Sequence, residues 1–347
     1  MRLLFITQIW DESDSVLGFV PAWVRALNTI FNPITIIALR ASSDKSPVPF
    51  PVYSLGKEEG KSRIFKVLRL YHLVWKLRGS YDTVFVHMNP EYILLAGLLW
   101  RLMGKKVVLW YAHGTVTWKL RLAVLFTSRV LTSTPEGCRI KSKKLRIVGQ
   151  AIDTGLFQPI QQSNSPALSL VVVGRVSASK GQYLTLQALN VLRKDGYDVR
   201  LTIIGAPVYD KDYEYQELCK DYVQKNGLSA VVTFTGAQSR AQLARILPAM
   251  FLCVNMSSTG SLDKAGLEAL VSGVPVITAN NAFRSVIAEV TPELMLSGAE
   301  VKDLADAIRW YVSLPQDKKT ESIHTLQNKV LHDHSLSTFA RRIADVL

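Results

Sequence analysis

Short apolar runs rich in β-branched residues alternate along this chain with segments that have helical spacing. A strand buried on both faces carries a nearly continuous apolar sequence, and such strands separated by helices form parallel sheets covered on both sides. The alternation therefore predicts an α/β protein. The expected strands are Leu3 to Ile6, Ile34 to Ala38, Val84 to Val86, Val107 to Trp110, Val130 to Leu131, Leu170 to Val173, Leu201 to Ile204, Val231 to Phe234, Leu252 to Val254 and Val276 to Ile277.

The length of 347 residues suits two domains, and a hydrophobic content of 48% is enough to give each a core. The segment from Phe157 to Pro166 is polar, holds two prolines and lacks periodicity, which is typical of a linker. We therefore expect a doubly wound domain over 1–158, a linker over 159–167 and a second doubly wound domain over 168–334. A terminal helix over 335–347 could pack on either domain, and we expect it on the first.

The net charge of +13 is concentrated in the first half of the chain. Residues 1–160 hold 22 Lys and Arg against 10 Asp and Glu, whereas the remainder holds 19 against 18. Such an imbalance favours an anionic neighbour: a membrane face, an acidic acceptor or nucleic acid. Nucleic acid is the weakest of the three, because no helix-turn-helix, zinc-finger or RRM signature accompanies the charge.

A basic amphipathic helix is expected between Lys61 and Gly79. Its apolar stripe would comprise Ile64, Val67 or Leu68, Tyr71, and Val74 or Trp75. Two interpretations stay open: the stripe covers the N-terminal sheet while the cations face water, or the cations also meet anionic lipid. The cations are Lys61, Arg63, Lys66, Arg69, Lys76 and Arg78.

The expected location is the cytoplasm, and the protein could also bind peripherally to the inner face of the membrane. Three widely spaced cysteines without a C-x-x-C pair favour a reduced compartment. The apolar run at the start meets Asp11 and Glu12 too early for a signal peptide, and no stretch approaches 18 uncharged apolar residues.

Two segments of the second half predict a site for a diphosphate. The small polar loop that begins at Ser257 leads into a helix expected to end at Gly273, and an open helix N-terminus receives phosphate groups. Upstream, Gly174 to Gly181 follows a predicted strand and carries Arg175 and Lys180. Two cations and a helix N-terminus together suit a diphosphate ligand.

These motifs resemble the retaining GT-B glycosyltransferases of family 4, the glycosyltransferase group 1 family, over almost the whole chain. The resemblance implies two Rossmann-like domains that face a central cleft. It implies that Arg175 and Lys180, after Gly174, bind the diphosphate of a nucleotide-sugar donor, and that Glu268 binds the ribose hydroxyls. A surface role for the cations, and an i,i+4 pair of Glu268 with Lys264, are the alternatives.

The sequence departs from the family pattern at one position. The pattern E-x(7)-E requires a glutamate eight residues before Glu268, where this chain has Gly260. Asp263, with Ser261 and Lys264 beside it, is the expected substitute at the donor sugar. Its alternative role is to complement the helix dipole.

In the first half, the resemblance makes His113, in Trp110 to Gly114, the residue that faces the donor sugar and the reacting centre. His87 ends the preceding predicted strand and is a candidate for acceptor contact, since ligands bind at the carboxyl ends of parallel strands. Gly18 could allow close approach to the donor, and Asp14 could bind an acceptor hydroxyl. The alternative for the histidines is a ring whose hydrogen bonds go to backbone groups at the end of a strand. The alternative for Asp14 is a loop residue that only faces water.

The expected function is therefore transfer of a hexose-type sugar, with retention, from a nucleotide-diphosphate sugar to a glycan or lipid-linked acceptor in envelope polysaccharide or glycolipid synthesis. A GT-B sugar-nucleotide epimerase and a catalytically impaired nucleotide-sugar-binding subunit are the alternatives, and a dehydrogenase comes last because G-x-G-x-x-G is missing. The resemblance implies no metal or other cofactor. Asp210 to Asp212, which matches a D-x-D pattern, is expected to be a solvated loop.

Overall fold

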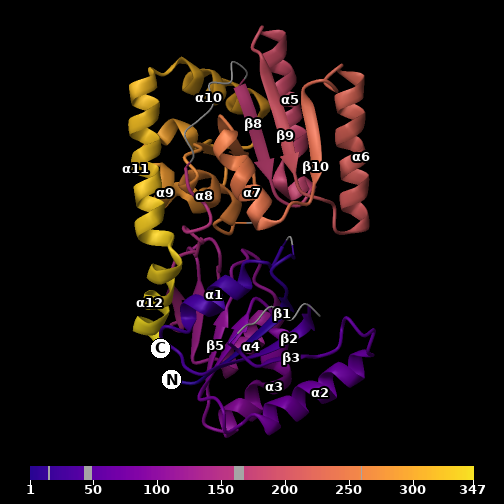
Figure 1. Ribbon diagram of the computed structural model, residues 1–347, viewed down its shortest axis with the longest axis vertical. Helices are drawn as coiled ribbons and strands as arrows, with labels where there is room; N and C mark the ends of the chain where they lie inside the picture. The colour runs from indigo at the N-terminus through magenta and orange to yellow at the C-terminus, as the bar shows by residue number, and fades with distance from the viewer. Residues whose placement is uncertain (15, 43–48, 160–167, 259) are drawn as a thin grey trace. The chain divides into compact units, whose positions relative to one another are not determined.

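The computed structural model describes residues 1–14, 16–42, 49–159, 168–258 and 260–347 (Figure 1). They form two compact units, one of Met1–Ala151 with Leu336–Leu347 and the other of Ile152–Ser335. The division comes before the expected boundary at 158, and the terminal helix belongs to the first unit. Apart from Pro159, the expected linker lies outside the described residues.

The first unit contains a seven-stranded sheet in the order β3-β2-β1-β4-β5-β6-β7. Every pair of neighbours is parallel. The strands are β1 (Leu3–Trp10), β2 (Ile34–Ala41), β3 (Val52–Ser54), β4 (Thr83–His87), β5 (Lys106–Trp110), β6 (Arg129–Thr132) and β7 (Leu145–Ile147). The helices are α1 (Val20–Leu27), α2 (Arg63–Lys76), α3 (Glu91–Leu102), α4 (Trp118–Phe126) and α12 (Leu336–Val346).

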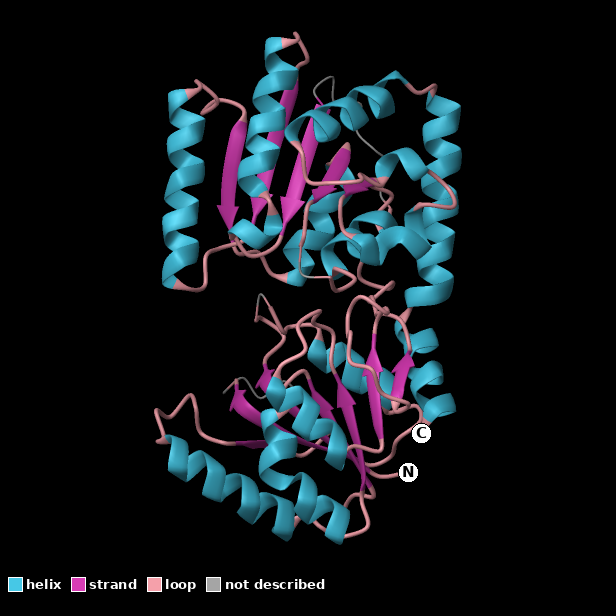
Figure 2. Ribbon diagram, turned by 180° about the vertical axis from the view of Figure 1, so that it is seen from behind, coloured by secondary structure: helices cyan, strands magenta, loops and turns pink. Residues whose placement is uncertain are grey.

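Alternate side chains of this sheet enter two separate cores. Leu4 and Ile6 of β1 join the core that contains buried side chains of α2, α3 and α4. Leu3 and Phe5 point the other way, into the core that α1 and α12 cover. Both faces of the sheet are therefore covered by helices, as a doubly wound fold requires (Figure 2).

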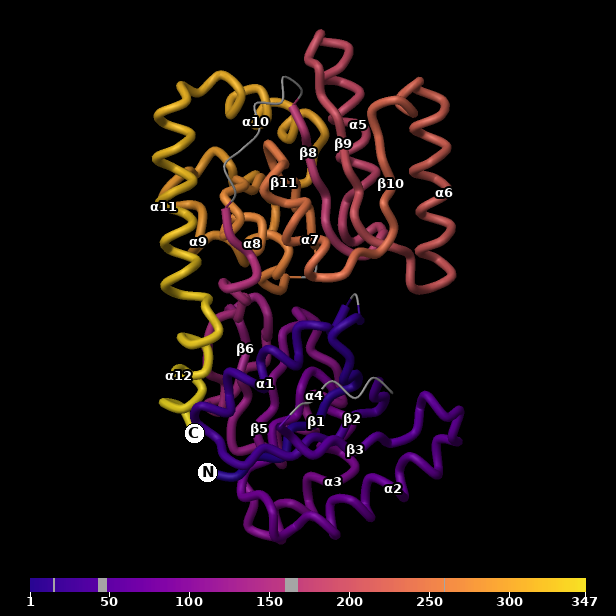
Figure 3. Tube along the Cα trace, viewed as in Figure 1, coloured from indigo at the N-terminus to yellow at the C-terminus, as the bar shows by residue number. Residues whose placement is uncertain are grey.

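The second unit holds a five-stranded parallel sheet in the order β10-β9-β8-β11-β12. Its strands are β8 (Leu168–Val173), β9 (Val199–Ile204), β10 (Val232–Gly236), β11 (Leu252–Asn255) and β12 (Val276–Thr278). Its α-helices are α5 (Gln182–Lys194), α6 (Asp210–Lys225), α7 (Arg240–Ile246), α8 (Lys264–Val271), α9 (Arg284–Ile287), α10 (Val301–Ser313) and α11 (Gln316–His334). Four 3-10 turns complete it: η1 (Ala178–Lys180), η2 (Leu247–Ala249), η3 (Asn281–Phe283) and η4 (Pro292–Leu294). After α11 the chain passes through Ser335 into α12 (Figure 3).

The ten expected strands are confirmed, and two further strands were not predicted. Both of these, β3 and β7, are three-residue strands at the two edges of the first sheet. None of their residues is buried, so they lack the continuous apolar sequence that marks the inner strands. The expected end of α8 at Gly273 is also confirmed, with Ser272 as the C-cap and Gly273 at φ 81°.

The predicted inner face of α2 is correct only in part. Ile64, Leu68 and Trp75 are 74%, 64% and 56% exposed, whereas the buried residues of this helix are Leu70, Leu73 and Val74. Of the expected stripe, Val74 is therefore buried as predicted, whereas Ile64 and Tyr71 are exposed. No helix in the described ranges is long and apolar enough to cross a membrane.

Candidate functional site

Two loops meet at the carboxyl edge of the second sheet. The strand order reverses between β8 and β11, and ligands of doubly wound folds bind at such a switch point. The loop after β11 lies against the loop after β8, because the Ser258 amide donates to the Ser179 carbonyl at 3.0 Å. The two motifs singled out in the sequence are thus brought together in space.

Glycines allow these loops to pack closely. A Cβ on Gly205 would lie 1.9 Å from the carbonyl oxygen of Gly174, and a Cβ on Gly181 would lie 2.6 Å from the Met256 Cβ. Gly174 itself has φ 138°, which disfavours other residues. The backbone conformation of Gly174, the predicted donor residue, therefore favours glycine at this position whether or not the donor contacts it.

Lys180 lies at the N-terminus of α8. Its ammonium forms an ion pair with Asp263, the N-cap residue of that helix, and donates to the Ser257 hydroxyl at 3.4 Å. Asp263 makes no side-chain capping bond to the helix within the described part of the chain. A cation and a helix N-terminus, both suited to an anion, are therefore adjacent.

Arg175 is directed to a different helix. Its Nε lies 3.5 Å from an oxygen of Asp212, and its guanidinium lies over the Tyr209 ring, 5.1 Å from the centroid. The expectation of a solvated loop at Asp210 to Asp212 is wrong: α6 begins at Asp210, and Asp212 is buried. The Asp212 carboxylate accepts bonds from the amides of Val208 and Tyr209, which caps the helix.

Glu268 is buried on α8 and paired with a cation that sequence reasoning missed. Arg240, the first residue of α7, donates to its carboxylate at 2.7 Å, and the two side chains are 19% and 4% exposed. Arg240 also lies over the Phe157 ring. The only sequence signal for Arg240 is a cation at the start of a helix that follows β10, which is too common to single out.

Lys264, one turn before Glu268, is strongly influenced by burial. Burial lowers the pKa of its ammonium well below the usual range, Glu268 opposes the change and Arg240 adds to it. Ser261 ties its loop to the segment that follows β12, since its carbonyl accepts a hydrogen bond from the Asn280 side chain at 2.8 Å. Gly260 has φ 74°, so a glutamate at this position would be strained.

In the first unit, His113 lies exposed in the loop after β5. Its Nδ1 accepts a bond from the Thr115 amide at 3.2 Å, so the neutral ring carries its proton on Nε2. The loop is tied to the end of β4, where the Met88 sulfur accepts from the Ala112 amide at 3.2 Å. Met88 adopts φ 63°, a strained conformation of the kind found at functional sites.

The predicted acceptor residue His87 lies in the core of this unit. His87 is 1% exposed and packs among Phe5, Phe19 and Trp23, so it is a core residue and not an acceptor contact. The sequence around His87 could not predict this burial, because the surrounding rings come from β1 and the region of α1.

Asp14 and Gly18 maintain their own loop. The Asp14 carboxylate accepts from the amides of Val16 and Leu17 and pairs with Arg40 at 2.8 Å. A Cβ on Gly18 would lie 2.4 Å from the carbonyl oxygen of Asp14, and Gly18 is buried. Both residues therefore have a structural role within this loop, and their contacts with substrate stay predictions.

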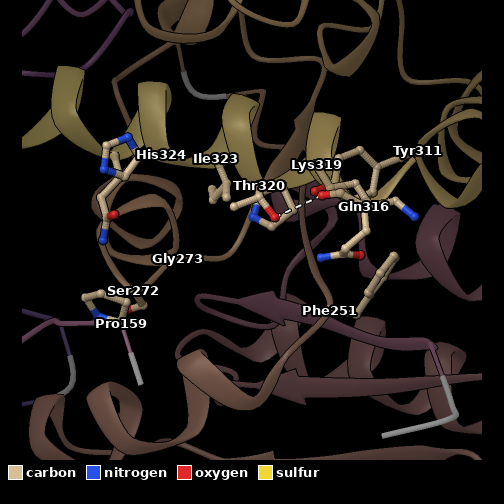
Figure 4. Close-up of a pocket in the computed structure, with 12 residues that line it drawn as sticks. Pro159, Phe251, Ser272, Gly273, Tyr311, Gln316, Lys319, Thr320, Ile323 and His324 are labelled. Carbon is tan, nitrogen blue, oxygen red and sulfur yellow. Dashed lines mark hydrogen bonds between the residues drawn. The ribbon is translucent and has the colours of Figure 1, made fainter. Parts of the chain in front are cut away.

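A cavity of about 490 Å³ lies at the opposite edge of the second sheet (Figure 4). Phe251 and Pro275, which precede β11 and β12, line it together with Tyr311 and Lys319. The Lys319 ammonium already donates to the Val312 carbonyl at 2.8 Å. Within the described ranges, no group of three or more His, Cys, Asp or Glu side chains is placed to hold a metal ion.

Solved structures with the same fold cover nearly the whole chain. HepE of Anabaena, in complex with UDP and glucose, has a TM-score of 0.78 at 14% identity and covers 99% of this chain and 98% of that one. The lipopolysaccharide outer core galactosyltransferase WaaB, in its apo form, has a TM-score of 0.67 at 15% identity, with coverage of 100% and 99%. Both units thus have the folds of GT-B glycosyltransferase structures.

Curated relatives match part of the chain. WcaL of Escherichia coli (strain K12), named provisionally as a colanic acid biosynthesis glycosyltransferase, is 20% identical over 59% of this chain and 51% of its own length. A D-inositol 3-phosphate glycosyltransferase of Mycobacterium tuberculosis is 28% identical over 48% of this chain and 35% of its own length. The chain therefore spans about half or less of these relatives.

Residues 167–313 match the family described as Glycosyl transferases group 1. This stretch contains both loops at the switch point, with Arg175, Lys180, Asp263 and Glu268. The match to group 1 glycosyltransferases thus covers most of the second unit, on a chain with the GT-B fold.

Proposed function

We propose that the protein transfers a hexose, with retention, from a nucleoside diphosphate sugar to an acceptor hydroxyl in envelope polysaccharide or glycolipid synthesis. The observation that carries this proposal is the position of Lys180 at the N-terminus of α8, beside the switch point of the second sheet. Structures of HepE with UDP and with UDP-glucose support a uridine donor.

The donor would displace existing ion pairs as it binds. Its diphosphate would take Lys180 from Asp263 and accept from the first amides of α8, while Arg175 turns from Asp212. Asp263 would then be free to accept from a hydroxyl of the sugar. Glu268, held by Arg240, would accept from the ribose hydroxyls.

The transfer step needs no enzyme nucleophile in this proposal. The bond between the anomeric carbon and the diphosphate oxygen breaks, and the acceptor oxygen bonds to the same face of the sugar. The acceptor proton passes to the departing diphosphate, whose growing negative charge Lys180 and Arg175 stabilise. His113 would donate a hydrogen bond from Nε2 to a hydroxyl of the donor sugar.

The test combines UDP binding with release of UDP from UDP-hexoses. We expect the double variant Arg175→Ala/Lys180→Ala to lose about a hundredfold or more in turnover, the scale of removing fixed charge from a transition state. Lys194→Ala, an exposed cation at the end of α5, is the matched control. Near-normal turnover of the double variant would reject the proposal, and we expect EDTA to leave the rate unchanged.

Two observations favour a second candidate, an impaired nucleotide-sugar-binding subunit. Gly260 has a left-handed backbone conformation, in which the glutamate of the family pattern would be strained. Asp263, the expected substitute, forms an ion pair with Lys180. This candidate predicts UDP binding without release of UDP from any UDP-hexose tested. An epimerase would instead convert the UDP-hexose without release of UDP.

We also propose a cytoplasmic enzyme that rests on the anionic inner face of the membrane. The cations Lys61, Arg63, Lys66, Arg69, Lys76 and Arg78 of the α2 region support this, and Lys61 and Arg69 have only Glu59 as a nearby described carboxylate. Co-sedimentation with vesicles rich in phosphatidylglycerol should be strong at low salt and weaken as salt rises. Failure to co-sediment at low salt would remove this part of the proposal.

A further inference from the structure

Three neighbouring helices of the first unit present large apolar side chains to solvent. The Tyr71 hydroxyl of α2 donates to the Leu95 carbonyl of α3 at 2.6 Å, and Lys119 of α4 forms an ion pair with Glu91 of α3. Eleven of the twenty exposed large apolar side chains in the described ranges lie on these helices. The most exposed are Ile64, Leu68, Leu98, Leu102, Trp118 and Leu125.

A cavity of about 630 Å³ opens among the same helices. Its apolar walls include Val67 and Leu70 of α2 and Leu94 and Leu95 of α3. Ligand cavities usually combine such walls with a few polar groups that fix orientation. Here the polar groups are mainly cations.

Arg63, Lys66 and Lys119 line this cavity. Lys119 pairs with Glu91, but neither Arg63 nor Lys66 forms an ion pair with any carboxylate in the described ranges. The helix α2 contains no acidic residue. The cavity therefore has apolar walls and an uncompensated positive charge, which complement a ligand that is both apolar and anionic.

A second cavity, of about 320 Å³, continues from the first toward the carboxyl edge of the sheet. Asn89, Glu91 and Lys119 line both cavities. The second is also lined by Met88 and Tyr111, which directly follow β4 and β5. A ligand seated among the three helices can therefore extend to the edge where the loop of His113 begins.

We infer that this pair of cavities binds the acceptor, and that the acceptor is a sugar carried on a lipid phosphate or lipid diphosphate, whose sugar supplies the acceptor hydroxyl. Its hydrocarbon chain lies against Val67 and Leu95, its phosphate lies at Lys66 and Lys119, and its polar end enters the second cavity. The exposed apolar face of the three helices contacts the membrane from which the lipid comes. This inference rests on the proposed transfer reaction, for which it names the acceptor class.

The test measures binding of oleoyl lysophosphatidic acid, below its micelle concentration, to the full chain. We expect Lys66→Gln/Lys119→Gln to weaken this binding by about tenfold or more, since each lysine supplies a charge-assisted hydrogen bond. The control Arg101→Gln/Arg121→Gln removes the same charge from exposed positions on α3 and α4 outside both cavities. It should bind the lysolipid within about twofold of the unmodified chain, as exposed charges act weakly at a distance.

Two further probes separate the sources of binding. Oleoylglycerol, which lacks the phosphate, and inorganic phosphate, which lacks the chain, should both bind much more weakly than the lysolipid. Equal binding of either probe, or an equal loss in the Arg101/Arg121 control, would overturn the inference. The thermal shift with UDP is measured in the same experiment. A shift with UDP but no binding of the lysolipid would reject only this inference. No shift with UDP would reject the proposed function.

Discussion

At the scale of single residues, the candidate site is a set of ion pairs. Lys180 pairs with Asp263, Arg175 with Asp212, and Arg240 with Glu268. Paired carboxylates keep the cations in place without a ligand, and a diphosphate can compete because it carries more charge than one carboxylate. When the donor binds, its diphosphate should then replace the carboxylates as the partner of these cations.

The Arg240–Glu268 pair gives a prediction about stability. Arg240→Met leaves the Glu268 carboxylate buried without its cation, which should lower the free energy of unfolding by about 3 kcal/mol. Chemical denaturation of the variant measures this loss. Arg240→Met/Glu268→Gln should regain part of it, because the second change removes the buried charge. A double variant as unstable as the sum of the single variants would show that the two side chains do not interact.

Lys264 gives a prediction about pH. Because burial holds its pKa well below the usual range, the free protein loses this proton at a pH where an exposed lysine would keep it. A bound diphosphate favours the charged ammonium, so UDP binding should take up a proton between the lowered pKa and about 10.4. UDP affinity should consequently fall as pH rises through that window.

Calorimetry in two buffers with different ionisation enthalpies counts the protons taken up. Lys264→Met should bind UDP without that uptake. Uptake that persists in Lys264→Met would assign the proton to another group. The same calorimetric titration gives the affinity at each pH, so both signs are checked together.

The residues that the sequence could identify are those with a local signal. Lys180, Asp263 and Glu268 lie in two short motifs. The structure places Lys180 and Asp263 at the N-terminus of α8 and Glu268 in the second turn of the same helix. Arg240 and Asp212 were missed because other helices bring them to the site. His87 was misjudged for the same reason, since the rings that bury it come from β1 and α1.

At the scale of elements, the inner strands were predictable because their burial on both faces gives a continuous apolar sequence. For α2, the spacing of apolar residues did not predict which face is buried. This helix is apolar on two sides, with Leu70, Leu73 and Val74 inward and Ile64, Leu68 and Trp75 outward. Periodicity cannot choose between two apolar stripes, because each has the spacing of a buried face. The outward stripe is the feature that makes a membrane contact worth testing.

The position of α8 depends on one glycine. A Cβ on Gly266 would lie 2.5 Å from the buried ring of Phe283, so Gly266→Val must push the helix from η3. Overpacking of this kind costs about 2 kcal/mol, or roughly 5 °C in Tm. UDP affinity should fall too, because α8 carries Glu268. Gly298→Val, which meets no atom within 4 Å, is the control, and an equal loss there would exclude the packing explanation.

At the scale of the whole molecule, the chain completes its first unit with its last helix. Phe339 of α12 is buried, with its ring centroid 4.3 Å from that of Trp23 and 5.3 Å from that of Trp110. The sequence offered an amphipathic terminal segment but no indication of the aromatic pocket that receives it. Long-range contacts of this kind follow from the fold and not from local pattern.

This arrangement predicts two separable unfolding transitions. Phe339→Ala should destabilise the first unit by about 3 kcal/mol and leave the second unchanged, because the lost contacts lie within the first unit. UDP at about 100 times its dissociation constant should stabilise only the second, by about 2.7 kcal/mol. Calorimetric scans with and without UDP measure both, with the exposed Asp345→Ala on α12 as control. A single transition that UDP and Phe339→Ala both shift as a whole would show that the two units unfold as one.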